Sequence, residues 1–169
     1  MTERDRPEPP ERAQRAEFAY VLPIPTRWMD NDVYGHVNNV VYYSYFDTAV
    51  NEHLVRAGVL DIHRSPAIGV VVETRCRFHH ELSFPETIDA GLAVRRLGRS
   101  SVVYRIGLFR QGHEDAAATG HFVHVYVDRQ ARTPVPVPPD VRRALAPLLL
   151  DPPPTQSPPT PISPAGEEA

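Results

Sequence analysis

Apolar and polar residues alternate along five stretches of this chain, and along a sixth the apolar residues recur at the spacing of an α-helix. Alternation with a period of two predicts strands, because successive side chains of a strand point to opposite faces of a sheet. The helix is expected over about 39–57, since Asn38 is a favourable N-cap residue and Gly58 occupies a position where helices commonly end. The five alternating stretches begin at Phe18, Ile68, Ile88, Val102 and His121.

One strand, one helix and then four strands follow each other along the chain, and this order predicts an α+β fold. We expect a largely antiparallel five-stranded sheet packed against one long helix, because that arrangement covers the apolar face of both. The first strand is predicted from Phe18 to Trp28, with Pro23 and Pro25 on its opposite face, as suits a strand at the sheet edge. On the second strand, the face expected to be buried carries Ile68, Val70, Val72, Thr74, Cys76 and Phe78.

Proline is concentrated at the two ends of the chain. Residues 1–15 are charged and residues 152–169 are rich in proline, so neither end offers enough apolar surface to offset the entropy cost of ordering it. Both ends are expected to be disordered, which leaves one domain over residues 16–151. Near the end of this domain, Val141–Leu150 is predicted to be a short helix interrupted at Pro147.

The 169 residues carry a formal charge of −3 and are 41% hydrophobic, which is typical of one soluble domain. The charge disfavours nucleic acid as a partner, and the chain has no apolar run long enough to predict a membrane span. The N-terminus is too charged for a signal peptide, so we expect a cytoplasmic protein. The single Cys76 agrees with a reducing compartment and is interpreted as a small buried apolar residue. All basic residues are arginine, which excludes a lysine Schiff base.

The polar cluster ahead of the helix contains the strongest candidates for chemistry. Arg27 to Tyr45 reads R-W-M-D-N-D-V-Y-G-H-V-N-N-V-V-Y-Y-S-Y, which places Asp30, Asp32 and His36 close to the predicted helix start. Unpaired backbone N–H groups and the positive end of the helix dipole stabilise negative charge at such a start. With carboxylates beside it, this layout favours acyl transfer, in which an oxyanion forms.

Other chemistries fit the polar residues less well. A calcium loop opened by the two aspartates would need oxygen ligands where the chain has Tyr34 and Val41. No G-x-S-x-G sequence predicts a serine nucleophile, and no cofactor is expected. No metal site is expected either, because two neighbouring pairs of histidines would each point to opposite faces of a strand. These pairs are His79 with His80 and His121 with His124.

The segment D-N-D-V-Y-G-H-V-N-N-V-V-Y-Y-S-Y-F-D, followed by a helix and four strands, resembles the hotdog-fold acyl-CoA thioesterases of the 4-hydroxybenzoyl-CoA thioesterase group. The resemblance covers roughly residues 17–140, and its most specific part is D-x-D-x-x-G-H-V-N-N. It implies a hotdog fold, in which a curved sheet wraps around the long helix, two protomers pair edge to edge and acyl-CoA lies at their interface. Many members carry a glutamate and an arginine where this chain has Asp47 and Val50, a difference that concerns the subfamily and the substrate more than the fold.

The resemblance also implies roles for individual residues. The catalytic carboxylate falls on Asp32, as a general base or as a nucleophile, while Asp30 is the second candidate and suits a structural role. The N–H groups that polarise the thioester carbonyl are expected around Asn39. His36 is a candidate general base or a donor that fixes the loop. Substrate contacts are expected from Gly35, Val37, Asn38 and Tyr42 beside the helix start, and from Arg99, Ser100 and Ser101, which suit the phosphates of CoA.

Together these features predict a thioesterase that hydrolyses an acyl-CoA or acyl-carrier-protein thioester. Two alternatives use the same fold: a hotdog hydratase, and a non-catalytic module that binds acyl-CoA in the same cleft. The protein is predicted to be a homodimer or a homotetramer, because one sheet wrapped on one helix leaves an open edge and half of a ligand cleft.

Overall fold

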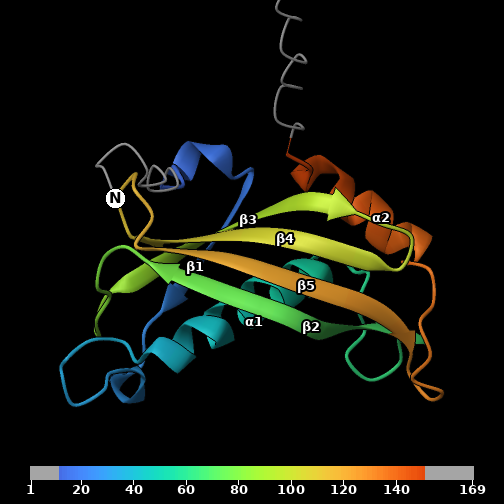
Figure 1. The fold of residues 1–169 in the computed structure, drawn as a ribbon, viewed down its shortest axis with the longest axis horizontal. Helices are drawn as coiled ribbons and strands as arrows, with labels where there is room; N and C mark the ends of the chain where they lie inside the picture. Colours follow the sequence, from blue (N-terminus) through green and yellow to red (C-terminus); the bar gives the residue numbers. More distant parts are fainter. Residues whose placement is uncertain (1–11, 151–169) are drawn as a thin grey trace, which may run out of the picture.

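The structure is a computed structural model and describes residues 12–150. Five antiparallel strands in the order β1-β3-β4-β5-β2 form one layer, and the long helix α1 (Asn39–Arg56) forms the other (Figure 1). The predicted α+β fold, with one strand, one helix and then four strands, is confirmed. The strands are β1 (Tyr20–Pro25), β2 (Ala67–Phe78), β3 (Thr87–Leu97), β4 (Ser101–Arg110) and β5 (Ala118–Asp128).

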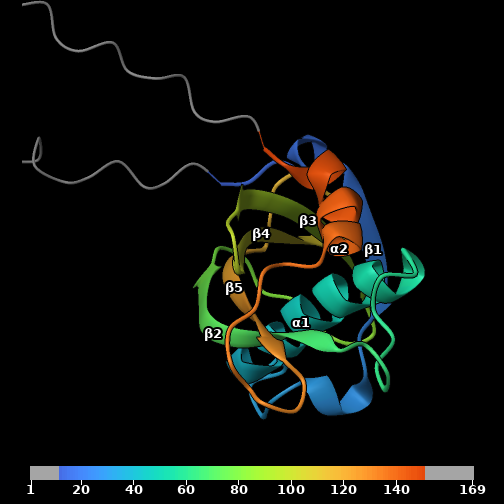
Figure 2. The same cartoon turned by 90° about the vertical axis from the view of Figure 1, so that its right-hand side faces the viewer.

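The sheet curves around α1, which lies across its concave face (Figure 2). Gly120 of β5 lies under Phe46, and a Cβ atom on this glycine would come within 2.7 Å of the phenyl ring. Glycine therefore lets the helix approach the sheet closely. The predicted helix ends are confirmed, because Asn38 is the N-cap and Gly58 follows the last turn with a φ of 71°. The buried residues of α1 are Tyr42, Tyr45, Phe46, Ala49, Val50 and Leu54.

The opposite face of the sheet is partly covered by the segment that precedes β1. The Phe18 ring lies over two glycines, since a Cβ atom on Gly91 or on Gly107 would come within 3 Å of it. It packs edge-on against Phe109, with 5.6 Å between the ring centroids, and Ala13 is fully buried beside them. A second, smaller apolar cluster therefore lies on the outer face of the sheet.

This cluster corrects the predicted start of the domain. Gln14 forms a backbone bridge with Asp115, and Arg15 pairs with Asp89 at 3.0 Å, so residues 12–15 pack against the domain instead of belonging to a disordered leader. The rest of the predicted leader, and residues 152–169 of the predicted tail, lie outside the described residues.

Two strands differ from their predicted extent. β1 ends at Pro25 because its neighbour β3 begins at the opposite residue, Thr87, and Trp28 instead opens a 3-10 turn with 82% of its surface exposed. In β2, a bulge between Val71 and Glu73 leaves Val72 58% exposed, although the alternation places it on the buried face. A bulge adds one residue to a strand and therefore shifts the face of the residues around it.

The last helix also starts earlier than predicted. Helix α2 (Pro139–Leu145) begins with a proline, which suits the first turn because its missing N–H has no helical partner there. The helix is interrupted near Pro147 as expected, since this residue lies in the 3-10 turn Ala146–Leu148.

Candidate active site

The polar motif folds into a 3-10 turn (Trp28–Asp30), a tight loop and the first turn of α1. Within the loop, the N–H of Asp32 donates to the carbonyl of His36 at 2.9 Å, and the N–H of Gly35 donates to the carbonyl of Asp32 at 3.1 Å. Gly35 adopts a φ of 87°, which glycine reaches without strain. The loop is closed on itself, and this fixes Asp32 relative to His36.

Asp30 is buried, with only 1% of its surface exposed. Its Oδ2 accepts hydrogen bonds from the backbone N–H of Arg27 at 2.8 Å and from the hydroxyl of Tyr45 at 2.7 Å, while its Oδ1 accepts from Nε of Arg27 at 2.9 Å. Burial acts to raise the pKa of Asp30, but the hydrogen bonds from Arg27 and Tyr45 outweigh it and lower the pKa. Both carboxylate oxygens are thus engaged within the protein, and Asp30 anchors the loop to the helix.

Asp32 is half-buried and borders a cavity of about 330 Å³. Its Oδ1 accepts a hydrogen bond from the N–H of Tyr34 at 2.8 Å, whereas Oδ2 has no hydrogen-bond donor within residues 12–150. One oxygen of this carboxylate therefore remains open to a ligand or a water molecule. Four other predicted site residues line the same cavity, namely His36, Val37, Asn39 and Tyr42.

The start of α1 supplies a free hydrogen-bond donor at this cavity. The Asn38 side chain accepts from the N–H of Val40 at 3.1 Å, and its carbonyl accepts the first helical hydrogen bond from Val41. In the described part of the chain, the N–H of Asn39 has no acceptor. Two predicted contact residues, Gly35 and Asn38, do not line the cavity and instead shape the loop and the helix start.

A further part of the cavity wall comes from the end of β2 and the residues after it, 78–81. Phe78 packs edge-on against the buried Tyr42, with 4.9 Å between the ring centroids, and burial raises the pKa of Tyr42 to about 12. The Nε2 atom of His36 lies 2.9 Å from a carboxylate oxygen of Glu81. Sequence reasoning missed the segment 78–81, because it is remote along the chain and reaches the loop only through tertiary contacts, such as the hydrogen bond from the N–H of Val37 to the carbonyl of Leu82.

The predicted phosphate-binding residues Arg99, Ser100 and Ser101 lie elsewhere in the protomer. They form the turn between β3 and β4, where the carbonyl of Arg99 accepts a hydrogen bond from the N–H of Val137 at 2.8 Å. The motif loop lies near the opposite end of β3, since the side chain of Asn31 accepts a hydrogen bond from the N–H of Phe84, three residues before β3 begins. The turn and the motif loop therefore lie at opposite ends of β3, whose 11 residues correspond to about 33 Å of extended strand. Within one protomer, this turn does not reach the cavity.

The described residues offer no group suited to metal binding and no reactive thiolate. Within residues 12–150, no group of side chains is placed to hold a metal ion, and no helix is long and apolar enough to cross a membrane. Burial raises the pKa of the Cys76 thiol to about 12, so this residue is not a thiolate at neutral pH.

Comparison with known proteins relates the chain to thioesterases by sequence and by structure. Residues 26–145 match the profile of the thioesterase-like superfamily. Among solved structures, the chain is similar to PA5185 of Pseudomonas aeruginosa strain PAO1, with 49% identity and a TM-score of 0.81, over 82% of this chain and 97% of that one. It is also similar to PA2801 of the same species, described as a candidate thioesterase, with 30% identity and a TM-score of 0.70 over 75% and 98% of the two chains.

The fold extends to more distant proteins. BH1999 gentisyl-coenzyme A thioesterase shares 24% identity with a TM-score of 0.66, over 75% of this chain and 99% of that one, which shows the common fold alone. A comparison with curated proteins gave no match.

Proposed function

The chain belongs to the thioesterase-like superfamily, and on that premise we propose that it hydrolyses an acyl thioester, with acyl-CoA as the substrate, in the cavity beside the start of α1. One observation carries this proposal: the same cavity joins a carboxylate with an open oxygen, Asp32, to a helix N–H without an acceptor, that of Asn39. Thioester hydrolysis needs a group that delivers the nucleophile and a donor for the oxyanion.

In the proposed reaction, the thioester carbonyl oxygen accepts a hydrogen bond from the N–H of Asn39. The positive end of the helix dipole strengthens this interaction as negative charge develops on the oxygen, so the transition state is bound more tightly than the substrate. Asp32 either takes a proton from the attacking water or attacks the carbonyl carbon itself to form a mixed anhydride that water hydrolyses. In both routes the thiol leaves and the free acid is released.

The neighbouring residues position these groups. Asp30, which precedes Asp32 by two residues, accepts hydrogen bonds from Arg27 and from Tyr45 of α1. These bonds hold the loop against the helix. His36 contacts Glu81, and we assign it the role of fixing the loop to the segment after β2. The aromatic pair of Tyr42 and Phe78 forms an apolar wall that excludes water from one side of the thioester, which strengthens electrostatic interactions in the cavity.

Hydrolysis of a panel of acyl-CoA thioesters, followed by thiol release, tests the proposal. Asp32→Asn keeps the shape of the side chain and removes its charge, so folding and substrate binding should survive while kcat falls by about 10²–10⁴-fold. Asp140→Asn, on an exposed part of α2, is the matched control and should retain full activity.

Three outcomes would contradict the assignment. Full turnover by Asp32→Asn together with loss of turnover in Asp30→Asn would transfer the catalytic role to Asp30. Binding of acyl-CoA without cleavage of any thioester would identify a non-catalytic binding module. Hydration of an enoyl-CoA without thiol release would identify a hydratase.

A further inference from the structure

His36 and Glu81 form a side-chain pair in the wall of the cavity that also holds Asp32. The Nε2 atom of His36 lies 2.9 Å from a carboxylate oxygen of Glu81, and both residues line the cavity. Their side chains are 43% and 72% exposed, and ion pairs that are open to solvent contribute little to the stability of a fold. Stability alone therefore does not account for the position of this pair.

Backbone contacts hold the two side chains against each other. The N–H of Val37, which follows His36, donates to the carbonyl of Leu82, which follows Glu81, at 2.8 Å. Val37 and Leu82 are both buried in the main core of the domain. The fold itself therefore brings the pair together, and its geometry does not depend on the attraction between the two side chains.

The carboxylate determines which nitrogen of the His36 ring is available to a ligand. A carboxylate only accepts hydrogen bonds, so Glu81 keeps the proton of a neutral imidazole on Nε2. The other nitrogen, Nδ1, has no hydrogen-bond partner within residues 12–150. A neutral ring accepts a proton at Nδ1 and a protonated ring donates one. A carboxylate that orients a histidine in this way is a recurrent arrangement for general acid–base catalysis.

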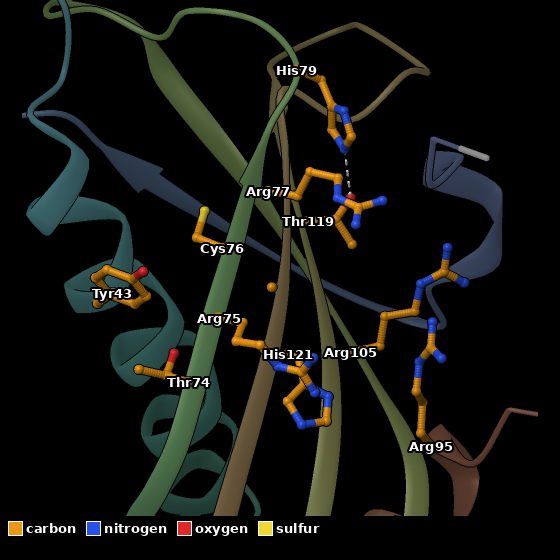
Figure 3. A pocket seen from close by; sticks show the side chains of 11 residues that line it. Tyr43, Thr74, Arg75, Cys76, Arg77, His79, Arg95, Arg105, Thr119 and His121 are labelled. Atoms are coloured by element: carbon orange, nitrogen blue, oxygen red, sulfur yellow. Dashed lines mark hydrogen bonds between the residues drawn. The ribbon is translucent and has the colours of Figure 1, made fainter. Parts of the chain in front are cut away.

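The other two histidines that line the cavity lack this arrangement. The Nε2 atom of His79 lies 3.2 Å from the hydroxyl oxygen of Thr119 (Figure 3), and burial lowers the pKa of His79. The Nε2 atom of His80 lies 2.8 Å from a guanidinium nitrogen of Arg12, which can only donate. In the described part of the chain, neither ring is paired with a carboxylate. His36 is therefore the histidine of this cavity that is best placed to exchange a proton with a ligand.

The proposed hydrolysis needs a third group besides Asp32 and the N–H of Asn39. When the C–S bond breaks, its electron pair goes to sulfur, and an alkyl thiolate leaves faster if it receives a proton at that moment. We propose that His36 donates this proton from Nδ1 and that Glu81 is the positioning residue that holds its ring. This inference rests on the proposed thioester hydrolysis.

The protons balance over one turnover. Nδ1 gives its proton to sulfur as the C–S bond breaks, which leaves a neutral imidazole and a free thiol. The water that supplies the hydroxyl group of the acid gives up one proton. This proton goes to His36 if water attacks a mixed anhydride, or to Asp32 and then through solvent to His36 if water attacks the thioester. One thioester and one water thus yield one acid and one thiol, and both side chains return to their starting states.

The leaving group separates proton donation from a purely structural role. The acyl group that is cleaved fastest from CoA is also attached to 4-nitrothiophenol, an acidic thiol whose anion leaves without a proton. The measured quantity is kcat/KM, because it reports only the steps up to C–S cleavage. His36→Gln should lower kcat/KM for the CoA ester by about 10²-fold, and it should leave kcat/KM for the aryl ester within about 3-fold of wild type.

Glu81→Gln should show the same selective loss, by at least about 10-fold, because an amide donates as well as accepts and no longer fixes the ring. In the double variant His36→Gln/Glu81→Gln, the loss should equal that of His36→Gln alone, since Glu81 acts through His36. Glu114→Gln, at an exposed position in the turn between β4 and β5, is the matched control and should retain both wild-type values. All variants should keep the wild-type midpoint of thermal unfolding to within a few degrees.

The outcomes separate this proposal from the proposed function. An equal loss for both esters in His36→Gln would show that the residue only shapes the loop, and an unchanged kcat/KM for the CoA ester would remove it from the reaction. Either result overturns proton donation while thioester hydrolysis stands. Additive losses in the double variant would overturn the positioning role of Glu81. If wild type cleaves no thioester, the proposed function fails, and this inference fails with it.

Discussion

The hydroxyl of Tyr45 donates a hydrogen bond of 2.7 Å to Oδ2 of Asp30, and this bond joins the second turn of α1 to the loop that carries Asp32. Burial and the adjacent carboxylate raise the pKa of Tyr45, so its hydroxyl keeps its proton and remains a donor at neutral pH. The position of the proposed catalytic carboxylate therefore depends on a second carboxylate that itself makes no contact with the cavity.

Replacement of Asp30 by Asn should destabilise the fold more than it alters the chemistry. The variant keeps the size of the side chain but loses the charge and one of the two oxygens that accept hydrogen bonds from Arg27 and the Tyr45 hydroxyl. Loss of hydrogen bonds to a charged group costs about 1.5–3 kcal/mol, which lowers the midpoint of thermal unfolding by several degrees. Calorimetry on Asp30→Asn and Asp32→Asn measures the contrast, and a larger loss of stability in Asp32→Asn would reverse these roles.

Ionisation of Asp30 should make the free energy of unfolding depend on pH. Its pKa is lowered in the folded state, so its contribution is complete above the ordinary carboxyl value of about 4 and is lost as the pH falls through the folded-state value. The difference in unfolding midpoint between wild type and Asp30→Asn should be constant from about pH 8 to 5 and shrink below about pH 4. A difference that persists unchanged at pH 3 would show that the side chain acts through its shape and not its charge.

His124 should make the domain sensitive to mild acid. It is 1% exposed, neither ring nitrogen has a partner within the described residues, and burial lowers its pKa to about 4. An unfolded histidine binds a proton near pH 6.5, so the unfolded state holds more protons between these two values. Stability should therefore fall as the pH drops from 6.5 to 4, by about 3 kcal/mol in total.

The variant His124→Phe tests this dependence, because it keeps a ring in the core and removes the titration. Urea unfolding at pH 7 and at pH 4.5 should show a smaller loss of stability in this variant than in wild type. His63→Phe, at an exposed position in the loop before β2, is the matched control and should retain the wild-type loss. Equal losses in all three proteins would assign the acid sensitivity to other groups.

Features encoded by neighbouring residues were predictable from the sequence. The helix was predictable with both ends, because Asn38 and Gly58 act within one turn of it. The number of strands and their order along the chain were predictable, because each strand has its own stretch of alternating apolar and polar residues. Asp32 and His36 were placed at the helix start for the same local reason, and the structure brings both to one cavity.

Features that depend on strand register were not predictable. Phe78 reaches the cavity because β2 pairs with β5 over its whole length and the chain then returns to the motif loop. The exposure of Val72 follows from a bulge that alternation cannot reveal. The role of residues 12–15 depends on the outer face of the sheet, where Gly91 and Gly107 leave room for Phe18.

The segment before β1 should therefore contribute to stability. A chain shortened to residues 12–150 keeps Phe18 and its cluster, whereas one that starts at residue 19 leaves the space over Gly91 and Gly107 empty. Removal of a buried phenylalanine side chain costs about 3–5 kcal/mol, so Phe18→Ala should approach the loss seen in the shorter chain. Thermal unfolding of the three proteins measures this. Equal stability of all three would show that the outer cluster adds nothing to the fold.

The open edge of the sheet should pair with a second copy of the chain along β2. β1 and β2 are the two edge strands, but β1 carries Pro23 and Pro25, which have no N–H to offer a neighbouring strand. β2 is 12 residues long and exposes Val71 and Val72 by 46% and 58%, and its charged residues begin only after them, at Glu73.

Edge pairing uses backbone groups in the plane of the sheet, so it leaves side chains that project from its outer face free. Light scattering should show a dimer or a larger oligomer. Val72→Lys places a charge on the pairing edge and should raise the dimer dissociation constant by at least about 10-fold, whereas Val55→Lys on α1 should not. Thioesterase activity should fall with dissociation if the cleft is shared between protomers. A wild-type monomer with full activity would instead place the whole substrate site within one chain.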